Sequence, residues 1–246
     1  MKIIDTHTHL PGFSFGKKPI PVKKLRKSFE DAGLYKAWFM TTDGLVSDPK
    51  KNNDILKEYV KNDLDFFVPF CTVDPKQGAT QAVKELNRAK NKLGMKGLKL
   101  HPWLQAFSMT HPAVLPVLKE AGRLNMPVLF HDGTPPYCTP LQIAEIAEAV
   151  PETTFILGHA GLDDLYQDAI IACNRLPNVY LCCCSISSGY ISKIIKQCPA
   201  EKLLYGSDGG FGKDLISDAL NKIYAVETDK SILEKIFFKN PSKLIR

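Results

Sequence analysis

The stretch Ile3-Ile4-Asp5-Thr6-His7-Thr8-His9 predicts a β-strand near the start of the chain, with two histidines at its end. His7 and His9 are separated by one residue, and alternate side chains of a strand point to the same face. Two imidazoles on one face of a strand end can converge on a single cation, because imidazole is a common metal ligand. The stretch therefore predicts a strand that carries part of a metal site.

Four further apolar runs also end in a residue that can bind a metal or transfer a proton. They are Gly97-Leu98-Lys99-Leu100-His101, Pro127-Val128-Leu129-Phe130-His131, Thr154-Phe155-Ile156-Leu157-Gly158-His159 and Leu203-Leu204-Tyr205-Gly206-Ser207-Asp208. The active face of a parallel barrel lies at the carboxyl ends of its strands, so such residues are expected to meet there. His111, the sixth histidine, precedes Pro112 outside this pattern, and we interpret it as a loop residue.

The order of predicted elements indicates the fold. Charged segments with helical spacing, such as residues 77–92, 113–124 and 141–150, separate the apolar runs. Alternating strands and helices predict a parallel sheet with right-handed crossovers. Eight strands in 246 residues match a single (β/α)8 TIM barrel, which typically has about 250 residues. We expect one α/β domain over residues 1–246, with strands near residues 2–7, 36–41, 66–73, 96–101, 127–131, 153–158, 178–184 and 202–207.

Composition narrows the class of protein. The chain is 44% hydrophobic, shows no apolar run long enough to cross a membrane and lacks the pattern of a signal peptide, so we expect a cytoplasmic protein without membrane contact. The net charge of +6 comes from dispersed lysines, which indicates a solvated basic surface or a field that attracts anionic substrates. No block of like charge suggests nucleic-acid binding. The seven cysteines are expected to be buried and reduced, and a homo-oligomer is compatible with the sequence.

The strand-end residues predict a catalytic metal centre. Three nitrogens from His7, His9 and His131 and one oxygen from Asp208 suit Zn²⁺ and are compatible with Mn²⁺ or Fe²⁺. A catalytic site of this kind leaves one position open for water. His159, flanked by glycines that we expect to leave room for a substrate, is the candidate acid, base or electrophile.

These motifs also carry a family resemblance. Ile-Asp-Thr-His-Thr-His-Leu, Gly-Leu-Lys-Leu-His-Pro, Val-Leu-Phe-His-Asp-Gly, Ile-Leu-Gly-His-Ala-Gly and Tyr-Gly-Ser-Asp resemble the amidohydrolase superfamily, and most closely its amidohydrolase-2 branch of metal-dependent TIM-barrel hydrolases and decarboxylases. The resemblance extends to Lys239-Asn240-Pro241-Ser242-Lys243-Leu244 and so covers essentially the whole chain.

The resemblance implies a role for each site residue. It implies that His7, His9, His131 and Asp208 bind the metal and that His159 is catalytic. Some relatives carry a bridging carboxylated lysine on strand four, where this chain has Lys99 and His101. We expect one ion rather than two, with Lys99 and His101 binding the substrate.

Our first hypothesis is a metal-dependent hydrolase of a small amide, lactone or ester, which includes anionic substrates. A metal-activated water would attack the substrate, Asp208 would transfer protons, and His159 would stabilise the oxyanion or assist proton transfer. The alternative is nonoxidative decarboxylation of a small carboxylic acid. It is weakened because the arginines, at positions 26, 88, 123, 175 and 246, avoid the strand ends.

Two other classes remain open from the sequence. A TatD-type nuclease resembles this chain in its His-x-His start, but it expects a glutamate on strand four and a Glu-Thr-Asp on strand eight. This chain has Lys99 and His101 at the first place and Gly206-Ser207-Asp208 at the second. A non-catalytic metal-binding protein would hold a metal without turnover.

Overall fold

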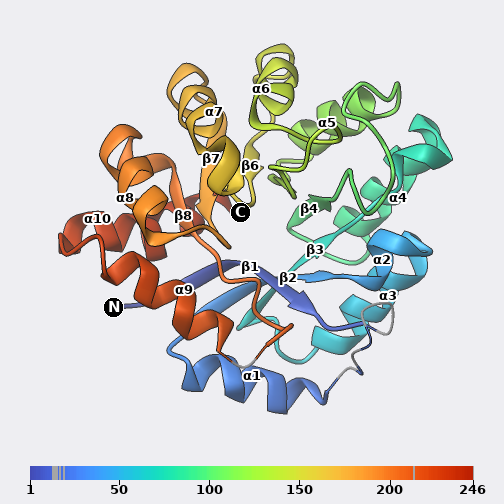
Figure 1. The fold of residues 1–246 in the computed structure, drawn as a ribbon. Coiled ribbons are helices and arrows are strands. Elements are labelled where there is room, and N and C mark those ends of the chain that lie inside the picture. The colour runs from blue at the N-terminus through green and yellow to red at the C-terminus, as the bar shows by residue number, and fades with distance from the viewer. Residues whose placement is uncertain (13–15, 17, 19, 213, 246) are drawn as a thin grey trace.

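The computed structural model describes residues 1–246 except 13–15, 17, 19, 213 and 246. Eight parallel strands follow one another in chain order, β1 to β8, and helices surround them as an outer ring (Figure 1). The last strand returns to the first at a bridge between Thr8 and Gly209, where the His9 amide donates to the Gly209 carbonyl at 2.7 Å. The sheet is therefore a nearly closed barrel, which confirms the predicted (β/α)8 fold.

The strands are short and fall close to their predicted places. They are β1 (Ile4–Leu10), β2 (Lys36–Thr41), β3 (Phe67–Cys71), β4 (Gly97–Leu100), β5 (Val128–Phe130), β6 (Phe155–Leu157), β7 (Val179–Cys183) and β8 (Leu203–Tyr205). The first boundary differs from the predicted 2–7, because pairing with β2 continues to Leu10 opposite Thr41. His7 and His9 consequently lie inside the strand, beside an irregularity in register between Asp5 and Thr8.

The helices connect successive strands. They are α1 (Val22–Asp31), α2 (Asp43–Val46), α3 (Pro49–Val60), α4 (Ala79–Asn91), α5 (Val114–Arg123), α6 (Pro140–Ala149), α7 (Leu162–Arg175), α8 (Ser188–Gln197), α9 (Leu215–Tyr224), α10 (Lys230–Glu234) and α11 (Asn240–Leu244). Short turns η2 (Pro75–Gln77) and η3 (Ala200–Lys202) and the π-helical η4 (Lys235–Lys239) complete the described elements. The three helices predicted at 77–92, 113–124 and 141–150 correspond to α4, α5 and α6.

Side chains alternate between two apolar layers, as the pleat of a strand requires. On β2, Phe39 packs outward against the helices, whereas Trp38 and Met40 fill the barrel interior. On β4, Leu98 and Leu100 face the helices, so that Lys99 between them points inward and is 1% exposed. The alternation thus places one lysine inside the barrel.

The cysteines follow the same alternation. Cys182 and Cys184 belong to the interior layer and Cys183 to the helix-facing layer, so the three do not gather into one cluster. All seven cysteines are buried and free of disulfides. Their burial agrees with the prediction from the sequence.

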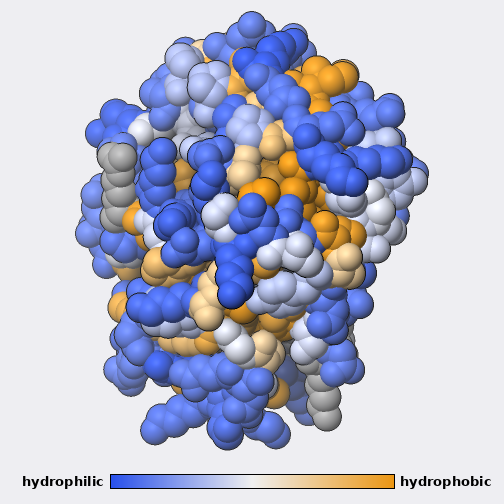
Figure 2. All heavy atoms as spheres, turned by 90° about the vertical axis from the view of Figure 1, so that its left-hand side faces the viewer, coloured by the Kyte–Doolittle hydropathy of each residue, from blue (hydrophilic) through white to orange (hydrophobic). Residues whose placement is uncertain are grey.

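The outer surface is mostly hydrophilic on the side that Figure 2 shows, with apolar atoms gathered in its recesses. Among the described residues, no helix combines the length and the apolar character needed to span a membrane.

Candidate active site and metal centre

A cavity of about 230 Å³ lies at the carboxyl ends of the strands. Six residues that the sequence singles out contribute to its wall: His7, His9, Lys99, His101, His131 and Asp208. The remaining lining residues are mainly apolar or aromatic: Thr42, Leu45, Trp103, Leu104 and Phe211. The strand-end pattern therefore corresponds to one concave site on the expected face of the barrel.

Three donor groups converge where β1 meets the end of β8. The Nε2 atoms of His7 and His9 lie 3.4 Å and 3.3 Å from Oδ1 of Asp208. Donor atoms of these three residues all lie within 4.8 Å of one another. The backbone fixes this arrangement, because the Asp208 amide donates to the His7 carbonyl at 2.9 Å.

The nitrogens of this group suit a divalent cation. His7 Nδ1 lies 3.1 Å from the Gly158 carbonyl, which can only accept, so Nδ1 carries the proton and Nε2 keeps its lone pair. Nδ1 of His9 is buried and has no hydrogen-bond partner among the described residues. Two imidazoles and one carboxylate match the donor preference of Zn²⁺, Mn²⁺ or Fe²⁺. The residues present thus fit a metal ion.

The charges of the site are strongly coupled. Burial alone would raise the pKa of Asp208, but the neighbouring His7, His159 and His9 outweigh it and hold that pKa well below its usual value. Burial lowers the pKa values of His7 and His9, and the nearby Lys99 lowers them further. The surroundings thus favour the ionised form of Asp208, whereas burial favours the neutral forms of His7 and His9.

Lys99 enters this group from β4. Its Nζ lies 3.0 Å from Nε2 of His7, so its hydrogen-bond partner is an imidazole. Burial lowers the Lys99 pKa to about 8, although Asp208 partly counteracts this effect. The Lys99 ammonium contacts Nε2 of His7, which is also the nitrogen that would bind a metal cation. Lys99 and a metal cation would therefore compete for this nitrogen.

A second set of imidazoles lies beside this group. Nδ1 of His131 lies 2.8 Å from Nε2 of His159, and the His131 ring stacks on His101 with centroids 3.8 Å apart. Burial lowers the pKa of His101 to about 2, and it lowers the pKa of His131 as well. Because His131 uses Nδ1 for His159, its Nε2 is the nitrogen left for a ligand.

His159 occupies a different place from the other predicted residues. It is 2% exposed and is not among the residues that line the described cavity. Its Nδ1 lies 3.9 Å from Oδ2 of Asp208 and 3.3 Å from the Cys184 carbonyl. His159 therefore reaches the cavity through Asp208 and His131.

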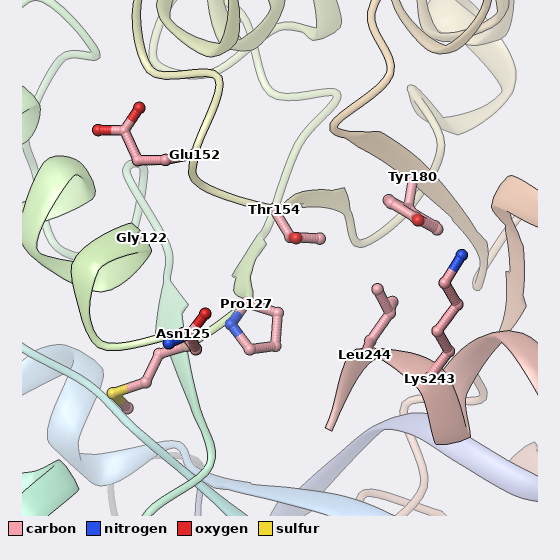
Figure 3. Close-up of a pocket in the computed structure, with 9 residues that line it drawn as sticks. Gly122, Asn125, Pro127, Glu152, Thr154, Tyr180, Lys243 and Leu244 are labelled. Atoms are coloured by element: carbon pink, nitrogen blue, oxygen red, sulfur yellow. The ribbon is translucent and has the colours of Figure 1, made fainter. Parts of the chain in front are cut away.

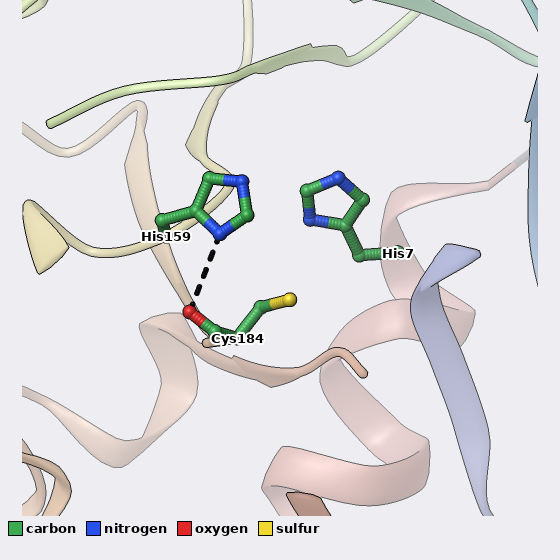
Figure 4. Close-up of side chains that lie close together, drawn as sticks. All are labelled: His7, His159 and Cys184. Atoms are coloured by element: carbon green, nitrogen blue, oxygen red, sulfur yellow. Dashed lines mark hydrogen bonds between the residues drawn. The ribbon is translucent and has the colours of Figure 1, made fainter. Parts of the chain in front are cut away.

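A second cluster of candidate donors, His7, His159 and Cys184, shares His7 with the first (Figure 4). The Cys184 thiol points toward His7, and burial raises the pKa of this thiol well above its usual value. Nδ1 of His7 and Nδ1 of His159 both face backbone carbonyls, Gly158 and Cys184 respectively. A cation here would have to displace both hydrogen bonds, so the His7–His9–Asp208 group fits a metal better.

One expectation about the glycines near His159 is wrong. A Cβ on Gly158 would lie 2.2 Å from the Phe130 carbonyl oxygen and 3.1 Å from the His7 ring. A Cβ on Gly161 would lie 2.3 Å from the Leu165 carbonyl oxygen. The space beside these glycines is filled by protein, so they allow close packing of the chain rather than the approach of a substrate.

Three supporting residues escaped the sequence analysis. Asp132 accepts hydrogen bonds from the amides of His159 and Gly161, at 2.7 and 2.6 Å. Asp5 accepts from the His7 amide at 3.0 Å and from the Ser207 hydroxyl at 2.5 Å, and burial raises its pKa to about 7. Ser185 donates its hydroxyl proton to Oδ2 of Asp208 at 2.6 Å. The only signal in the sequence is a polar residue next to each predicted strand end.

The sequence also predicts that three loops that follow strands, residues 10–21, 105–112 and 134–140, form part of the substrate wall, and these loops contribute unequally to the cavity. The connection after β4 supplies Trp103 and Leu104, which immediately precede the predicted 105–112 stretch. Residues 134–140, all of them described, do not contribute to the cavity wall. In the predicted 10–21 loop, residues 13–15, 17 and 19 lie outside the described part of the chain.

A cavity of about 200 Å³ also exists at the opposite end of the barrel (Figure 3). Tyr180 and Lys243 lie on one side of it, and Asn125 lies on the other. Its described lining has no histidine and one carboxylate, that of Glu152. This cavity lacks the paired titratable groups that acid–base or metal chemistry needs.

Comparison with solved structures supports the fold. The 5-carboxyvanillate decarboxylase of Sphingomonas paucimobilis is 13% identical, with a TM-score of 0.78 over 100% of this chain and 99% of that one. The dihydroxybenzoic acid decarboxylase of Polaromonas, with bound manganese and 2-nitroresorcinol, is 15% identical, with a TM-score of 0.75 over 99% and 96%. The probable 2-pyrone-4,6-dicarboxylic acid hydrolase of Acinetobacter baumannii, with bound citric acid, is 18% identical, with a TM-score of 0.74 over 99% of each chain.

A search of curated protein sequences gives no match. The family model described as Amidohydrolase, by contrast, matches residues 4–246 and therefore includes every strand of the barrel and every residue of the site. Members of this family are metal-dependent enzymes, which agrees with the donor group at the barrel mouth. This chain belongs to the amidohydrolase family.

Proposed function

We propose that this protein is a metal-dependent hydrolase of a small anionic amide, lactone or ester, and that the cavity around His7, His9 and Asp208 is its active site. The observation that carries the proposal is Asp208 itself. Its Oδ1 lies 3.4 Å and 3.3 Å from the Nε2 atoms of His7 and His9, the nitrogens that we propose hold the cation. An ionised carboxylate at this place can accept a proton from water, as hydrolysis requires.

A divalent ion bound here would supply the Lewis acidity that activates water and polarises a carbonyl. We assign His7, His9 and Asp208 as its ligands, and His131 through Nε2 as the fourth. We favour one ion, because the second donor cluster shares His7 and its nitrogens are used by backbone carbonyls. We favour Zn²⁺ for its match to nitrogen and carboxylate donors, with Mn²⁺ and Fe²⁺ as alternatives.

The cavity wall supports a small anionic substrate. The Lys99 ammonium and His101 supply hydrogen-bond donors, whereas Trp103 and Phe211 offer aromatic surface. When a cation binds His7, Lys99 loses its imidazole partner and can turn to a substrate carboxylate. The volume of about 230 Å³ is small beside the several hundred Å³ of drug-sized sites.

In the proposed mechanism, His159 acts from a position behind the cavity wall. Its position 3.9 Å from Oδ2 of Asp208 supports proton transfer through that carboxylate. A role as oxyanion stabiliser is supported less, because His159 is not part of the described cavity wall.

The test is a panel of anionic lactones, amides, esters and aromatic acids, assayed in ¹⁸O-labelled water with the metal-loaded protein. We expect one solvent oxygen in the product and a loss of about 10²- to 10⁴-fold in kcat for Asp208→Asn, the range of general-base catalysis. Full turnover after removal of the metal, verified by elemental analysis, would overturn the proposal.

Decarboxylation of a small aromatic acid is the second candidate. Lys99 provides the basic group that no arginine supplies: Arg26, Arg88, Arg123 and Arg175 form ion pairs outside the cavity, and Arg246 lies outside the described residues. Two of the three similar structures are decarboxylases of aromatic acids. The carbon left by CO₂ also needs a proton, which in this candidate would have to come from a group other than the ionised Asp208. Release of CO₂ without solvent oxygen in the product would decide for it.

A further inference from the structure

The end of β7 carries no residue that the sequence analysis selected, yet it contacts both candidate acid–base residues. The Cys184 carbonyl lies 3.3 Å from Nδ1 of His159, and the hydroxyl of Ser185 lies 2.6 Å from Oδ2 of Asp208. Ser185 is exposed and is not among the residues that line the described cavity. The hydrogen bond to Asp208 is the contact that links this hydroxyl to the site.

The backbone at this contact is unusual on both sides. Ser185 and Asp208 each have a φ of 58°, in the left-handed region that non-glycine residues seldom adopt. Backbone of this kind is maintained only where its surroundings determine it, and it concentrates at functional sites. Here it places two neighbouring strand ends so that the hydroxyl meets the carboxylate.

We propose that Ser185 is a positioning residue that fixes the plane of the Asp208 carboxylate. The final torsion of an aspartate is broad, so a carboxylate without a fixed partner can rotate. With Oδ2 held by Ser185, Oδ1 stays 3.4 Å and 3.3 Å from the His7 and His9 nitrogens. Ser185 thus keeps three of the four proposed metal ligands, His7, His9 and Asp208, aimed at one point, an inference that rests on the proposed function.

Three substitutions separate the hydroxyl from the backbone strain. Ser185→Ala removes the hydroxyl and keeps the Cβ that is unfavourable at this φ. Ser185→Gly removes the hydroxyl and relieves the strain, because glycine adopts positive φ readily. Ser185→Thr keeps the hydroxyl, but its branched Cβ makes the backbone less favourable. If the serine only supports the fold, activity should follow thermal stability across the series.

The experiment measures Mn²⁺ affinity by paramagnetic resonance, kcat/KM on the substrate found by the panel, and melting temperature. We expect the alanine and glycine variants to lose about 10- to 100-fold in affinity or kcat/KM, as for other residues that orient metal ligands. Glycine should melt above alanine and still be impaired, whereas threonine should melt lowest and retain affinity and activity within a few-fold of wild type.

Two results would count against these ideas, and they are distinguishable. Wild-type affinity in the alanine and glycine variants, or losses that follow melting temperature, would overturn the role of Ser185 while the proposed function stands. A wild-type protein that binds no Mn²⁺ and hydrolyses nothing in the panel would overturn the proposed function, and the role of Ser185 with it.

Discussion

The two ends of the barrel carry cavities of similar volume, about 230 Å³ at the carboxyl ends of the strands and about 200 Å³ at the opposite end. At the first, His7, His9 and Asp208 are in contact with one another and largely buried. At the second, Lys243 and Glu152 are exposed to solvent. Volume is thus nearly equal, whereas the burial and mutual contact of charged groups differ.

The two cavities differ in the burial of their charged groups and not in their volume, so burial is the property that distinguishes the candidate active site. At the carboxyl ends of the strands, burial and neighbouring charges shift the pKa values of the titratable cavity residues, which are His7, His9, Lys99, His101, His131 and Asp208. Perturbed groups that meet in a cleft are typical of functional sites. At the opposite cavity, burial raises the pKa of Tyr180. The following substitutions test whether the two ends differ in function as they differ in electrostatics.

The largest effect is expected from His7→Ala. It removes a proposed metal ligand and the partner of Lys99, so both metal content and turnover should be lost, with kcat/KM down by about 10³-fold or more. Elemental analysis and steady-state kinetics measure the two losses. A variant that keeps its metal and its rate would exclude His7 from the site.

Lys99→Met should have the next largest effect. The substitution removes the buried ammonium, and hydrogen bonds to charged groups are worth about 1.5–3 kcal/mol, so KM for an anionic substrate should rise about 10- to 100-fold. A neutral ester of the same substrate is the control, and its KM should change much less. Equal changes for both substrates would show that Lys99 does not recognise charge.

The raised pKa of Asp5 predicts that the free energy of unfolding depends on pH. Its pKa of about 7 in the folded protein exceeds the value near 3.9 in an unfolded chain, so the folded state binds the extra proton between these values. The contribution of Asp5 to the free energy of unfolding should be fully present below about pH 4 and be lost as pH rises through 7, by at most ~4 kcal/mol.

Asp5→Asn removes this titration while keeping the side-chain shape. Denaturant unfolding of metal-free protein from pH 4 to 8 should show the variant gaining stability relative to wild type as pH rises. A constant difference across this range would mean that Asp5 titrates normally in the folded state.

The smallest effect is expected at the opposite cavity. Lys243→Ala and Tyr180→Phe alter side chains with no hydrogen bond or ion pair among the described residues. Stability should change by no more than about 0.5 kcal/mol, as for other surface substitutions, and kcat/KM by less than about twofold. A large loss of activity in either variant would show that the two ends are coupled.

The sequence predicts the barrel and the identity of its strand-end residues because both signals are local. A short apolar run marks each strand, and a histidine or aspartate ends five of these runs. It does not predict which side chains touch, since this depends on how neighbouring strands are staggered. The Lys99–His7 contact, the His131–His101 stack and the Ser185–Asp208 hydrogen bond all join different strands.

The position of His159 behind the cavity wall is not predicted from the sequence for a similar reason. Its place at the end of β6 is predicted correctly, but its position behind His131 depends on the turn that follows. Ala160, Gly161 and Leu162 all have positive φ, of 46°, 85° and 56°, and Asp132 holds this turn through two amides. Consecutive left-handed residues are not visible as a sequence pattern, so the depth of His159 could not be anticipated.

The proposed metal site depends on closure of the barrel, because its ligands lie on both sides of the contact between β1 and the end of β8. His7 and His9 leave the ribosome some two hundred residues before Asp208. The proposed donor set cannot exist until the last strand docks beside the first. During synthesis the nascent chain would thus present His7 and His9 before Asp208 is available. Binding of a cation by all three residues would then indicate that the barrel has closed.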